Sequence, residues 1–418
     1  MDFMIKNVGF VGGLLIAILL ACSPNGLKSL SVGGSPAGGS SSSSRGGSIP
    51  SGGTTGTGGS TPTGGTVPTG GTVPTGGTVP DGGRDARPDV PVDVPDVYPD
   101  APIDGRPDGP FDIRPDIPDT EPLNCSPPIS CYAQNCGPNS NENCCTSLIV
   151  PGGYFYRGYD GIDFTDQSYP ATVNDFCLNK FEVTVGRFRV FFNSGAGTQL
   201  NPPVTGSGAH PLIPGSGWNS DWNTSLPANQ IAFIQSLKCD GIYETWSDVP
   251  AYNENRPQNC LSWYEAFAFC AWDGGRLATE SEFNYASSGG NEQRQYPWGT
   301  GLDPTKASYY VDDIQQCMGD MVYGCSIYDL IEVGTKPLGN GCWMHADLAG
   351  NVRTWTLDYH QDLWPMPCNN CSALEPTQYR TLHGGFFSRG DSGQLRSAAR
   401  DFVIPETRSS TIGFRCAY

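Results

Sequence analysis

The sequence SWYEAFAFCAWDGGRLATESEF, residues 262–283, predicts two helices joined by a tight turn. Ser262 and Thr279 each precede a Glu by three residues, the capping-box spacing at which the Glu side chain returns to the N–H of the capping residue. Between the boxes, Gly274-Gly275 ends the first helix. Apolar residues on that helix recur at i, i+3, i+4 and i+7 and would form one face on a core: Trp263, Ala266, Phe267 and Cys270.

The surrounding sequence predicts one folded domain over 147–418. Trp and Tyr are frequent there, apolar runs are short and bounded by turn residues, and strands and helices do not alternate in a regular rhythm. A length of about 270 residues is one that a single domain can reach. The chain has no Gly-Lys-Ser/Thr phosphate loop and no Gly-x-Ser-x-Gly nucleophile elbow, so other common enzyme classes gain no support.

A cysteine-rich segment, 123–146, precedes this domain. Its cysteines follow the spacing Cys-x5-Cys-x4-Cys-x7-Cys-Cys from Cys125 to Cys145, among Asn, Pro and Gly residues. A segment this short cannot build its own apolar core, so disulfides are expected to hold it together. Zinc is the alternative, but the segment has no histidine and lacks the Cys-x2-Cys pairs that place two thiolates on one metal.

Residues 22–122 are predicted to form a disordered tether. They contain Gly/Ser runs, three copies of Thr-Gly-Gly-Thr-Val-Pro across 63–80, and a Pro/Asp tract, none of which can build a core. Residues 81–122 hold 11 Asp and one Glu against four Arg, so 12 − 4 gives a net charge of −8 out of the chain's −18. A charge run of this kind is usually a solvated segment; binding of cations or of a basic partner is the alternative. Nucleic acid is not an expected partner.

Residues 1–21 are predicted to be a lipoprotein signal peptide. Lys6 precedes an apolar run over 8–20, and Leu-Leu-Ala directly precedes Cys22. Cleavage after Ala21 would leave Cys22 as an acylated first residue, whose chains would anchor the protein to a membrane. The run falls short of the roughly 20 apolar residues that span a bilayer, while an ordinary secretory signal stays open. The predicted location is the cell envelope, in the periplasm or at the cell surface.

The cysteine content also indicates an oxidising compartment. The chain has 16 cysteines, which is heavy for a reducing cytosol. Removing Cys22 from the count leaves 16 − 1 = 15, an odd number. If all the others bridge within the chain, at least one thiol is unpaired or forms an intermolecular bond.

Ordered sequence blocks recur along the predicted domain. In chain order they read DFCLNKFEVT (175–184), WYEAF (263–267), GRLATESEF (275–283), YPWG (296–299), LAGNVRTW (348–355), HGG (383–385), SAAR (397–400) and GFRC (413–416). Together they resemble the formylglycine-generating enzyme, or sulfatase-modifying factor, family. The resemblance spans nearly the whole domain.

This resemblance implies an α+β fold, a variant of the C-type-lectin-like architecture with little regular secondary structure. It implies a disulfide between Cys270 and Cys416, and it places a second family disulfide on Ser287 and Ser397, where both cysteines have been replaced together. Several cysteines have no family counterpart: Cys177, Cys260, Cys317, Cys325, Cys342, Cys368 and Cys371. Structural bridges in loops are favoured for them, although Cys368 and Cys371 have the spacing of a redox pair.

The resemblance also bears on cofactors. Active family members hold copper(I) between two cysteines shortly after a Gly-Gly-Ser-Trp block, because thiolates suit a soft metal. Here Phe386 replaces the serine and no cysteine lies between Cys371 and Cys416, so copper is not expected. The resemblance also implies a calcium site at Asp347, Gly350, Val352 and Thr354. Thr354 stands where the family has a Glu, so the retention of calcium stays open.

Five residues are expected to line the former substrate groove: Trp355, His383, Arg389, Arg396 and Arg400. His383 could act there as an acid, a base or a hydrogen-bond donor, or it could be a packed histidine, and the arginines could instead pair with buried carboxylates. The leading hypothesis is a lipid-anchored binding or structural module with a peptide or glycan ligand. The alternative is an active oxidoreductase that converts a substrate cysteine to formylglycine with displaced cysteines, Cys368 and Cys371.

Overall fold

The computed structural model describes residues 125, 128–131, 134–388 and 392–418. The predicted signal peptide (1–21), the acylation site Cys22, the tether (22–122) and Arg389 lie outside the described residues. Within the described part, none of the helices is both long enough and apolar enough to cross a membrane.

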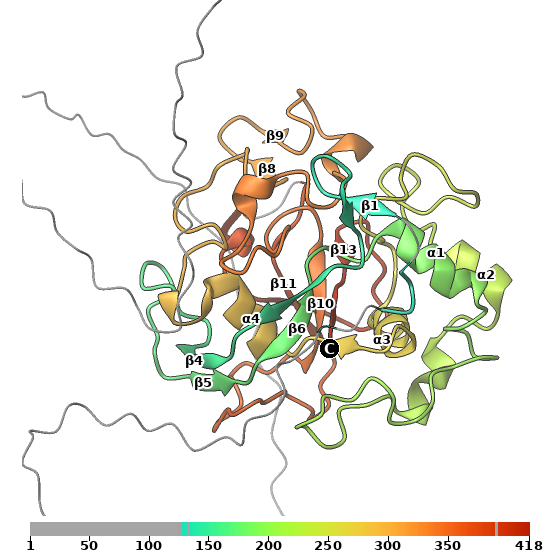
Figure 1. Ribbon diagram of the computed structural model, residues 1–418, viewed down its shortest axis with the longest axis horizontal. Helices are drawn as coiled ribbons and strands as arrows, with labels where there is room; N and C mark the ends of the chain where they lie inside the picture. Colours follow the sequence, from blue (N-terminus) through green and yellow to red (C-terminus); the bar gives the residue numbers. More distant parts are fainter. Residues whose placement is uncertain (1–124, 126–127, 132–133, 389–391) are drawn as a thin grey trace, which may run out of the picture. The chain divides into compact units, whose positions relative to one another are not determined.

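Short helices and short strands are mixed along the chain (Figure 1), and this confirms the predicted α+β class with little regular secondary structure. The α-helices are α1 (Val185–Asn193), α2 (Gln230–Ser236), α3 (Trp263–Trp272) and α4 (Glu280–Ser288). Short 3-10 helices cover Ser220–Ser225, Gly290–Glu292, Ile327–Asp329, Pro337–Gly339 and Ser392–Leu395. The strands are β1 (Asn135–Cys136), β2 (Glu142–Asn143), β3 (Ser147–Val150), β4 (Gly153–Tyr156), β5 (Pro170–Val173), β6 (Phe176–Asn179), β7 (Arg276–Leu277), β8 (Tyr310–Val311), β9 (Gln316–Cys317), β10 (Arg353–Tyr359), β11 (Arg380–His383), β12 (Asp401–Val403), β13 (Ile412–Gly413) and β14 (Cys416–Ala417).

Two larger sheets form the framework of the described residues. One has the order β12-β11-β10-β13, in which β10 is antiparallel to β11 and parallel to β13. The other has the order β3-β6-β14-β7, so the end of the chain pairs with Leu178 of β6 and Arg276 of β7 through Ala417. Figure 1 accordingly marks the C-terminus beside β6 and α3. This closure places the end of the chain inside a sheet that begins with β3.

Both predicted capping boxes are confirmed. The Ser262 hydroxyl accepts a hydrogen bond from the Glu265 N–H at 3.4 Å, and the Glu265 carboxylate accepts one from the Ser262 N–H at 2.8 Å. Thr279 and Glu282 repeat the arrangement at 3.1 and 2.8 Å. After α3, Gly274 has φ +85°, a left-handed conformation that glycine adopts without a Cβ clash. The two helices therefore begin where the sequence predicts, and α3 also ends where it predicts.

The burial of α3 is wider than the single apolar face predicted for it. Every residue from Trp263 to Cys270 is buried, including Glu265, whose carboxylate accepts two hydrogen bonds from Arg408 at 2.5 and 2.6 Å. On another side, Phe269 stacks on Phe188 of α1 with ring centroids 5.7 Å apart. Periodicity shows which face of a helix is most apolar, but it cannot show that an arginine from the end of the chain will cover its carboxylate.

Disulfides cross-link the described part of the chain along its length, and they hold the cysteine-rich segment as predicted. One bridge, between Cys125 and Cys177, joins that segment to β6. The bridges between two described residues are Cys125–Cys177, Cys131–Cys145, Cys136–Cys144, Cys239–Cys260, Cys270–Cys416, Cys317–Cys325 and Cys368–Cys371. Among the described residues no cysteine is free, so the unpaired thiol expected from the odd count is not found there. So many bridges indicate an extracytoplasmic, oxidising compartment.

The two family disulfide positions behave as the resemblance implied. Cys270 and Cys416 are bonded. The Ser397 hydroxyl donates a 2.9 Å hydrogen bond to the main-chain oxygen of Ser287, so the two serines that stand at the second position lie together.

The Cys270–Cys416 bridge should stabilise the fold more than the Cys317–Cys325 bridge does. It joins cysteines that are 146 residues apart, whereas Cys317 and Cys325 are 8 apart. The loss of chain entropy in the unfolded state then predicts a stabilisation of about 5 kcal/mol for the first bridge and about 2.5 kcal/mol for the second. Unfolding of the full chain by guanidinium should show a loss about twice as large for Cys270→Ala/Cys416→Ala as for Cys317→Ala/Cys325→Ala. Equal losses would contradict this expectation.

Candidate functional site

A buried carboxylate, Glu280, lies at the centre of the candidate site. It is the first residue of α4 and is 1% exposed. Arg400, which directly precedes β12, places its Nε 2.8 Å from one carboxylate oxygen, and His383, the last residue of β11, places its Nε2 3.4 Å from the same oxygen. Two of the predicted groove residues, His383 and Arg400, thus meet at a carboxylate that the sequence did not single out.

The charges around Glu280 keep it ionised. Burial alone raises the pKa of this carboxyl, but the positive charge of Arg400 and the hydrogen bond from His383 outweigh that effect and hold the pKa below its ordinary value. His360 stands on the other side of Arg400, whose Nη2 donates to the His360 Nδ1 at 3.2 Å. Burial and the charge of Arg400 lower the pKa of His360, so this ring is neutral and can accept the hydrogen bond.

A second buried carboxylate, Asp358 of β10, lies next to Glu280. One of its oxygens accepts the Glu280 N–H at 2.7 Å and the other accepts the Ala373 N–H at 2.7 Å. Burial and the negative charge of Glu280 raise the pKa of Asp358 to about 7. The two neighbouring carboxyls therefore differ in charge state: Glu280 is ionised at neutral pH and Asp358 is close to its midpoint.

The loop 361–372 lies over this pair of acids. The guanidinium of Arg400 lies 4.3 Å from the centroid of the Trp364 ring, and the guanidinium of Arg157 lies 5.1 Å from it. Arg157, which follows β4, is 1% exposed. It donates to the Pro365 oxygen at 2.7 Å and to Cys371 Sγ at 3.3 Å. An aromatic ring between two cations thus connects the carboxylates to the loop that carries the Cys368–Cys371 disulfide.

The other predicted groove residues lie elsewhere. Trp355 is 0% exposed within the main hydrophobic core, so its assignment to the groove is wrong. The reason is that β10 runs between β11 and β13, and Trp355 packs inward, with its Nε1 3.4 Å from the Leu261 oxygen. Arg396 pairs with Asp160 at 3.0 Å and also with Asp163. It therefore holds the turn over 160–164, the alternative that the sequence left open.

Sequence reasoning missed Glu280, Asp358 and Arg157. One signal could have found the first, because the segment 279–282 contains two Glu residues and the capping box uses only Glu282. Glu282 is further occupied by Arg276, which donates at 2.6 Å to each oxygen. Glu280 is left without a local partner, and its neighbours come from three other segments of the chain.

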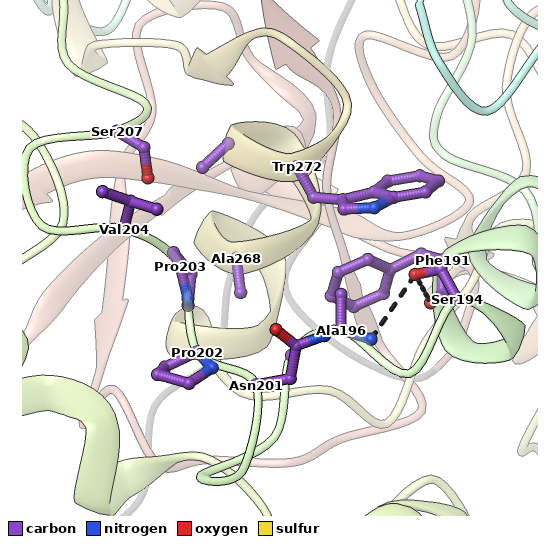
Figure 2. Close-up of a pocket in the computed structure, with 12 residues that line it drawn as sticks. Phe191, Ser194, Ala196, Asn201, Pro202, Pro203, Val204, Ser207, Ala268 and Trp272 are labelled. Carbon is purple, nitrogen blue, oxygen red and sulfur yellow. Dashed lines mark hydrogen bonds between the residues drawn. The ribbon is translucent and has the colours of Figure 1, made fainter.

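A separate cavity of about 300 Å³ lies between α3 and the loop 194–207. Figure 2 shows Ala268 and Trp272 of α3 on one side of it and Pro203 and Val204 on the other. Its lining is mostly apolar, and Phe191 of α1 closes one end. None of the described groove residues predicted from the sequence lines this cavity.

The family model described as "Sulfatase-modifying factor enzyme 1-like domain" matches residues 132–418. The chain belongs to the sulfatase-modifying factor family. Its α+β fold, low in regular secondary structure, is the fold of that family.

Curated relatives of this family member include both active and inactive proteins. A formylglycine-generating enzyme of Mus musculus is 32% identical over 287 residues, which covers 64% of this chain and 73% of the relative. A formylglycine-generating enzyme of Streptomyces coelicolor is 33% identical over 294 residues, with coverage of 64% and 87%. An "Inactive C-alpha-formylglycine-generating enzyme 2" of Mus musculus is 26% identical over 293 residues, with coverage of 64% and 84%. Membership of the family alone therefore does not decide whether this chain is an oxidase.

The residues of the implied family calcium site have varied surroundings. Asp347 accepts the Gly334 N–H at 2.6 Å through its carboxylate, and Arg415 donates to its main-chain oxygen at 2.8 Å. The Val352 N–H donates to Glu182 at 3.3 Å. Gly350 donates its N–H to the Gly384 oxygen, and Thr354 lies in β10 opposite His383 and Gly413. Calcium binding stays a prediction of the resemblance.

Replacing Asp358 should remove a pH-dependent loss of stability. Because the pKa of Asp358 is raised from 3.8 to about 7, the folded protein retains a proton that the unfolded chain releases between these values. Its stabilising contribution is complete below pH 3.8 and is lost as the pH rises through 7. An asparagine has no such proton. From pH 5 to pH 8, the unfolding free energy of wild type should fall by about 2 kcal/mol relative to Asp358→Asn.

Urea unfolding at both pH values measures this difference. Asp362→Asn, a change at an exposed acid in the neighbouring loop, is the matched control and should run parallel to wild type. An Asp358→Asn protein whose pH dependence matched that of wild type would show that the buried carboxyl is ionised throughout this range.

Proposed function

We propose that this protein is a lipid-anchored component of the cell envelope whose sulfatase-modifying-factor domain binds a ligand and does not convert cysteine to formylglycine. The observation that carries the proposal is the donor set. The segment 384–400, which begins with the Gly-Gly block, contains no cysteine. Copper(I) selects thiolates, and the described cysteines are all held in disulfides. These residues do not fit the copper site of an oxidase.

The packing of this segment supports the same conclusion. Phe387 is 0% exposed and packs with Leu330 and Val352, while Leu395 is 2% exposed. Phe386, at the position of the family serine, has the guanidinium of Arg353 4.6 Å from its ring centroid. Apolar and cation–aromatic contacts thus fix the described part of this segment. The inactive relative from Mus musculus supports the idea that members of this family persist without the oxidase activity.

The surface around loop 361–372 is the proposed binding region for a peptide or glycan. Arg400 and Trp364 are both mostly buried but reach the surface beside the exposed residues Asp362, Leu363 and Met366. An aromatic ring with ionised groups near it can pack on a side chain or a sugar face while the charges bind polar groups of the ligand. His383 would act indirectly, by holding Glu280 in place.

The anchor and the calcium site are parts of the proposal that rest on sequence. Acylation of Cys22 would attach the tether to a membrane, and the disulfides of the domain are compatible with export. Calcium, if retained, would bind at Asp347, Gly350, Val352 and Thr354.

The competing activity is oxidation of a substrate cysteine by the displaced pair Cys368 and Cys371. In the structure these two cysteines form a disulfide, so neither sulfur is a thiolate available to copper(I). A reduced pair would be the required metal ligand, and this can be tested directly.

The full chain should give no aldehyde when it is incubated with copper(I), oxygen and a Cys-x-Pro-x-Arg peptide. Mass spectrometry of the peptide is the measurement, and the enzyme of Streptomyces coelicolor is the positive control, which should convert the same peptide. Conversion by this chain that Cys368→Ser abolishes would overturn the proposal and place an active site at the displaced cysteines. Conversion that survives this substitution would overturn it as well.

A further inference from the structure

The Cys368–Cys371 disulfide lies beside a buried cation that it does not neutralise. Arg157 is 1% exposed, and its Nη1 lies 3.3 Å from Cys371 Sγ. Its Nη2 donates to the Pro365 oxygen at 2.7 Å and contacts Met366 Sδ at 3.2 Å, while its Nε has no hydrogen-bond partner among the described residues. These contacts are all with neutral groups. A Cys371 thiolate would supply a negative charge at the position of the sulfur, which a disulfide does not.

The turn that carries this disulfide is held by hydrogen bonds that do not require it. The Thr172 N–H of β5 donates to the Cys368 oxygen at 3.0 Å, and the Asn370 N–H returns to the Thr172 oxygen at 2.8 Å. The Asn174 N–H donates to the side-chain oxygen of Asn370 at 2.7 Å. Reduction would therefore leave the two sulfurs side by side, ready to close again.

This bridge contributes little to the stability of the fold. It closes a separation of 3 residues, whereas Cys270–Cys416 closes one of 146. The restriction that a disulfide places on the unfolded chain grows with the length of the closed loop. Stabilisation of the fold alone does not account for a bridge inside a turn that is already hydrogen-bonded to β5.

The second sulfur also has a stabilising partner. The Ser281 hydroxyl lies 3.5 Å from Cys368 Sγ and 3.6 Å from Cys371 Sγ. Ser281 is in the first turn of α4, where the helix dipole favours negative charge. The hydroxyl can donate to a Cys368 thiolate, so each sulfur has a neighbour that favours its ionised form.

We propose that Cys368–Cys371 is a redox-active disulfide that exchanges with a dithiol on a polypeptide partner. A partner thiolate attacks the Sγ of Cys371, the more exposed of the two residues. The S–S bond breaks and Cys368 leaves as a thiolate beside Ser281. The partner's second thiolate then attacks its own sulfur in the mixed disulfide, and Cys371 leaves as a thiolate beside Arg157. Two partner thiols are oxidised to a disulfide, Cys368–Cys371 is reduced to two thiols, and the two protons released by the partner balance the two thiolates.

The surroundings suit a polypeptide. Leu363 is 68% exposed and Met366 49% exposed, and Asn369, between the two cysteines, is also exposed. These residues offer apolar and amide contacts next to the reacting sulfur. Other charges act on Arg157 as well: Glu280, Asp358 and Tyr169 support its positive charge, and Arg400 opposes it. The activity needs neither copper nor oxygen, so it is distinct from the oxidase alternative. It uses the same loop, 361–372, as the proposed ligand-binding region.

The first test compares two disulfides in one molecule. The full chain is equilibrated with mixtures of reduced and oxidised dithiothreitol, the free thiols are alkylated, and peptides containing each bridge are quantified by mass spectrometry. Cys317–Cys325, which closes a separation of 8 residues, is the internal reference. Each bridge is half reduced at a particular ratio of reduced to oxidised dithiothreitol. For Cys368–Cys371 this ratio should be on the order of tenfold lower than for Cys317–Cys325. If the two bridges are reduced together, the proposal is overturned, and no variant is needed for that result.

Substitutions at Arg157 test the physical cause. Arg157→Gln should bring the midpoint of Cys368–Cys371 to within about threefold of the reference, and Arg157→Lys, which keeps a positive charge, should restore part of the difference. The matched control is Arg189→Gln, which changes an arginine on α1 that pairs with Glu254. It should leave the midpoint unchanged. An Arg157→Gln midpoint equal to that of wild type would overturn the role of the cation.

A third measurement follows the thiolate itself. In Cys368→Ser, the rate of Cys371 alkylation as a function of pH should give a pKa below the value of about 8.5 of an ordinary thiol. Adding Arg157→Gln should raise that pKa by about one unit or more. The oxidised full chain should also oxidise a reduced two-cysteine peptide, and Cys368→Ser/Cys371→Ser should not. Failure of the peptide reaction or an ordinary pKa for Cys371 would overturn the proposal.

Discussion

A buried ion pair between α1 and the end of α3 joins the parts of the domain on which the rest depends. The guanidinium of Arg187 lies 2.6 Å from the carboxylate of Asp273, and both side chains are almost fully buried. Asp273 also accepts the Ser130 N–H at 2.6 Å and the Tyr418 hydroxyl at 3.2 Å. Two buried charges are costly unless their remaining hydrogen bonds are satisfied. Here the cysteine-rich segment and the last residue satisfy them, so both must be in place before the pair is favourable. Because Asp273 ends α3 and β7 and α4 follow directly, the same pair fixes where Glu280 begins its helix.

Local signals in the sequence predicted local structure well. Capping boxes at Ser262 and Thr279 work within four residues, so their geometry is nearly independent of the rest of the fold. The pair Cys270 and Cys416 came from likeness to a family, since nothing in the sequence alone pairs cysteines 146 residues apart. The site was harder to predict: His383 and Arg400 were found, but the carboxylate that joins them was not. Trp355 was misplaced because a tryptophan in a short strand has the same local sequence whether the strand is central or at an edge.

The site shows how burial and neighbouring charges give two adjacent carboxyls different charge states. Glu280 and Asp358 are neighbours in the same buried region, and their pKa values move in opposite directions because Arg400 and His383 face only the first. This arrangement depends on contacts between β10, β11 and α4, and on Arg400, the last residue of the segment 384–400, which contains no cysteine here.

The bridge from Cys125 to Cys177 also determines how the domain would carry a mechanical load. A pull on the chain ahead of Cys125 passes through the disulfide directly into β6 and bypasses residues 126–176. Those residues include β3, β4 and β5, whose main chain therefore lies outside the loaded path. The force instead reaches β6 between β3 and β14, where hydrogen bonds on both sides share it. A domain held in this way resists being peeled apart from its N-terminal end.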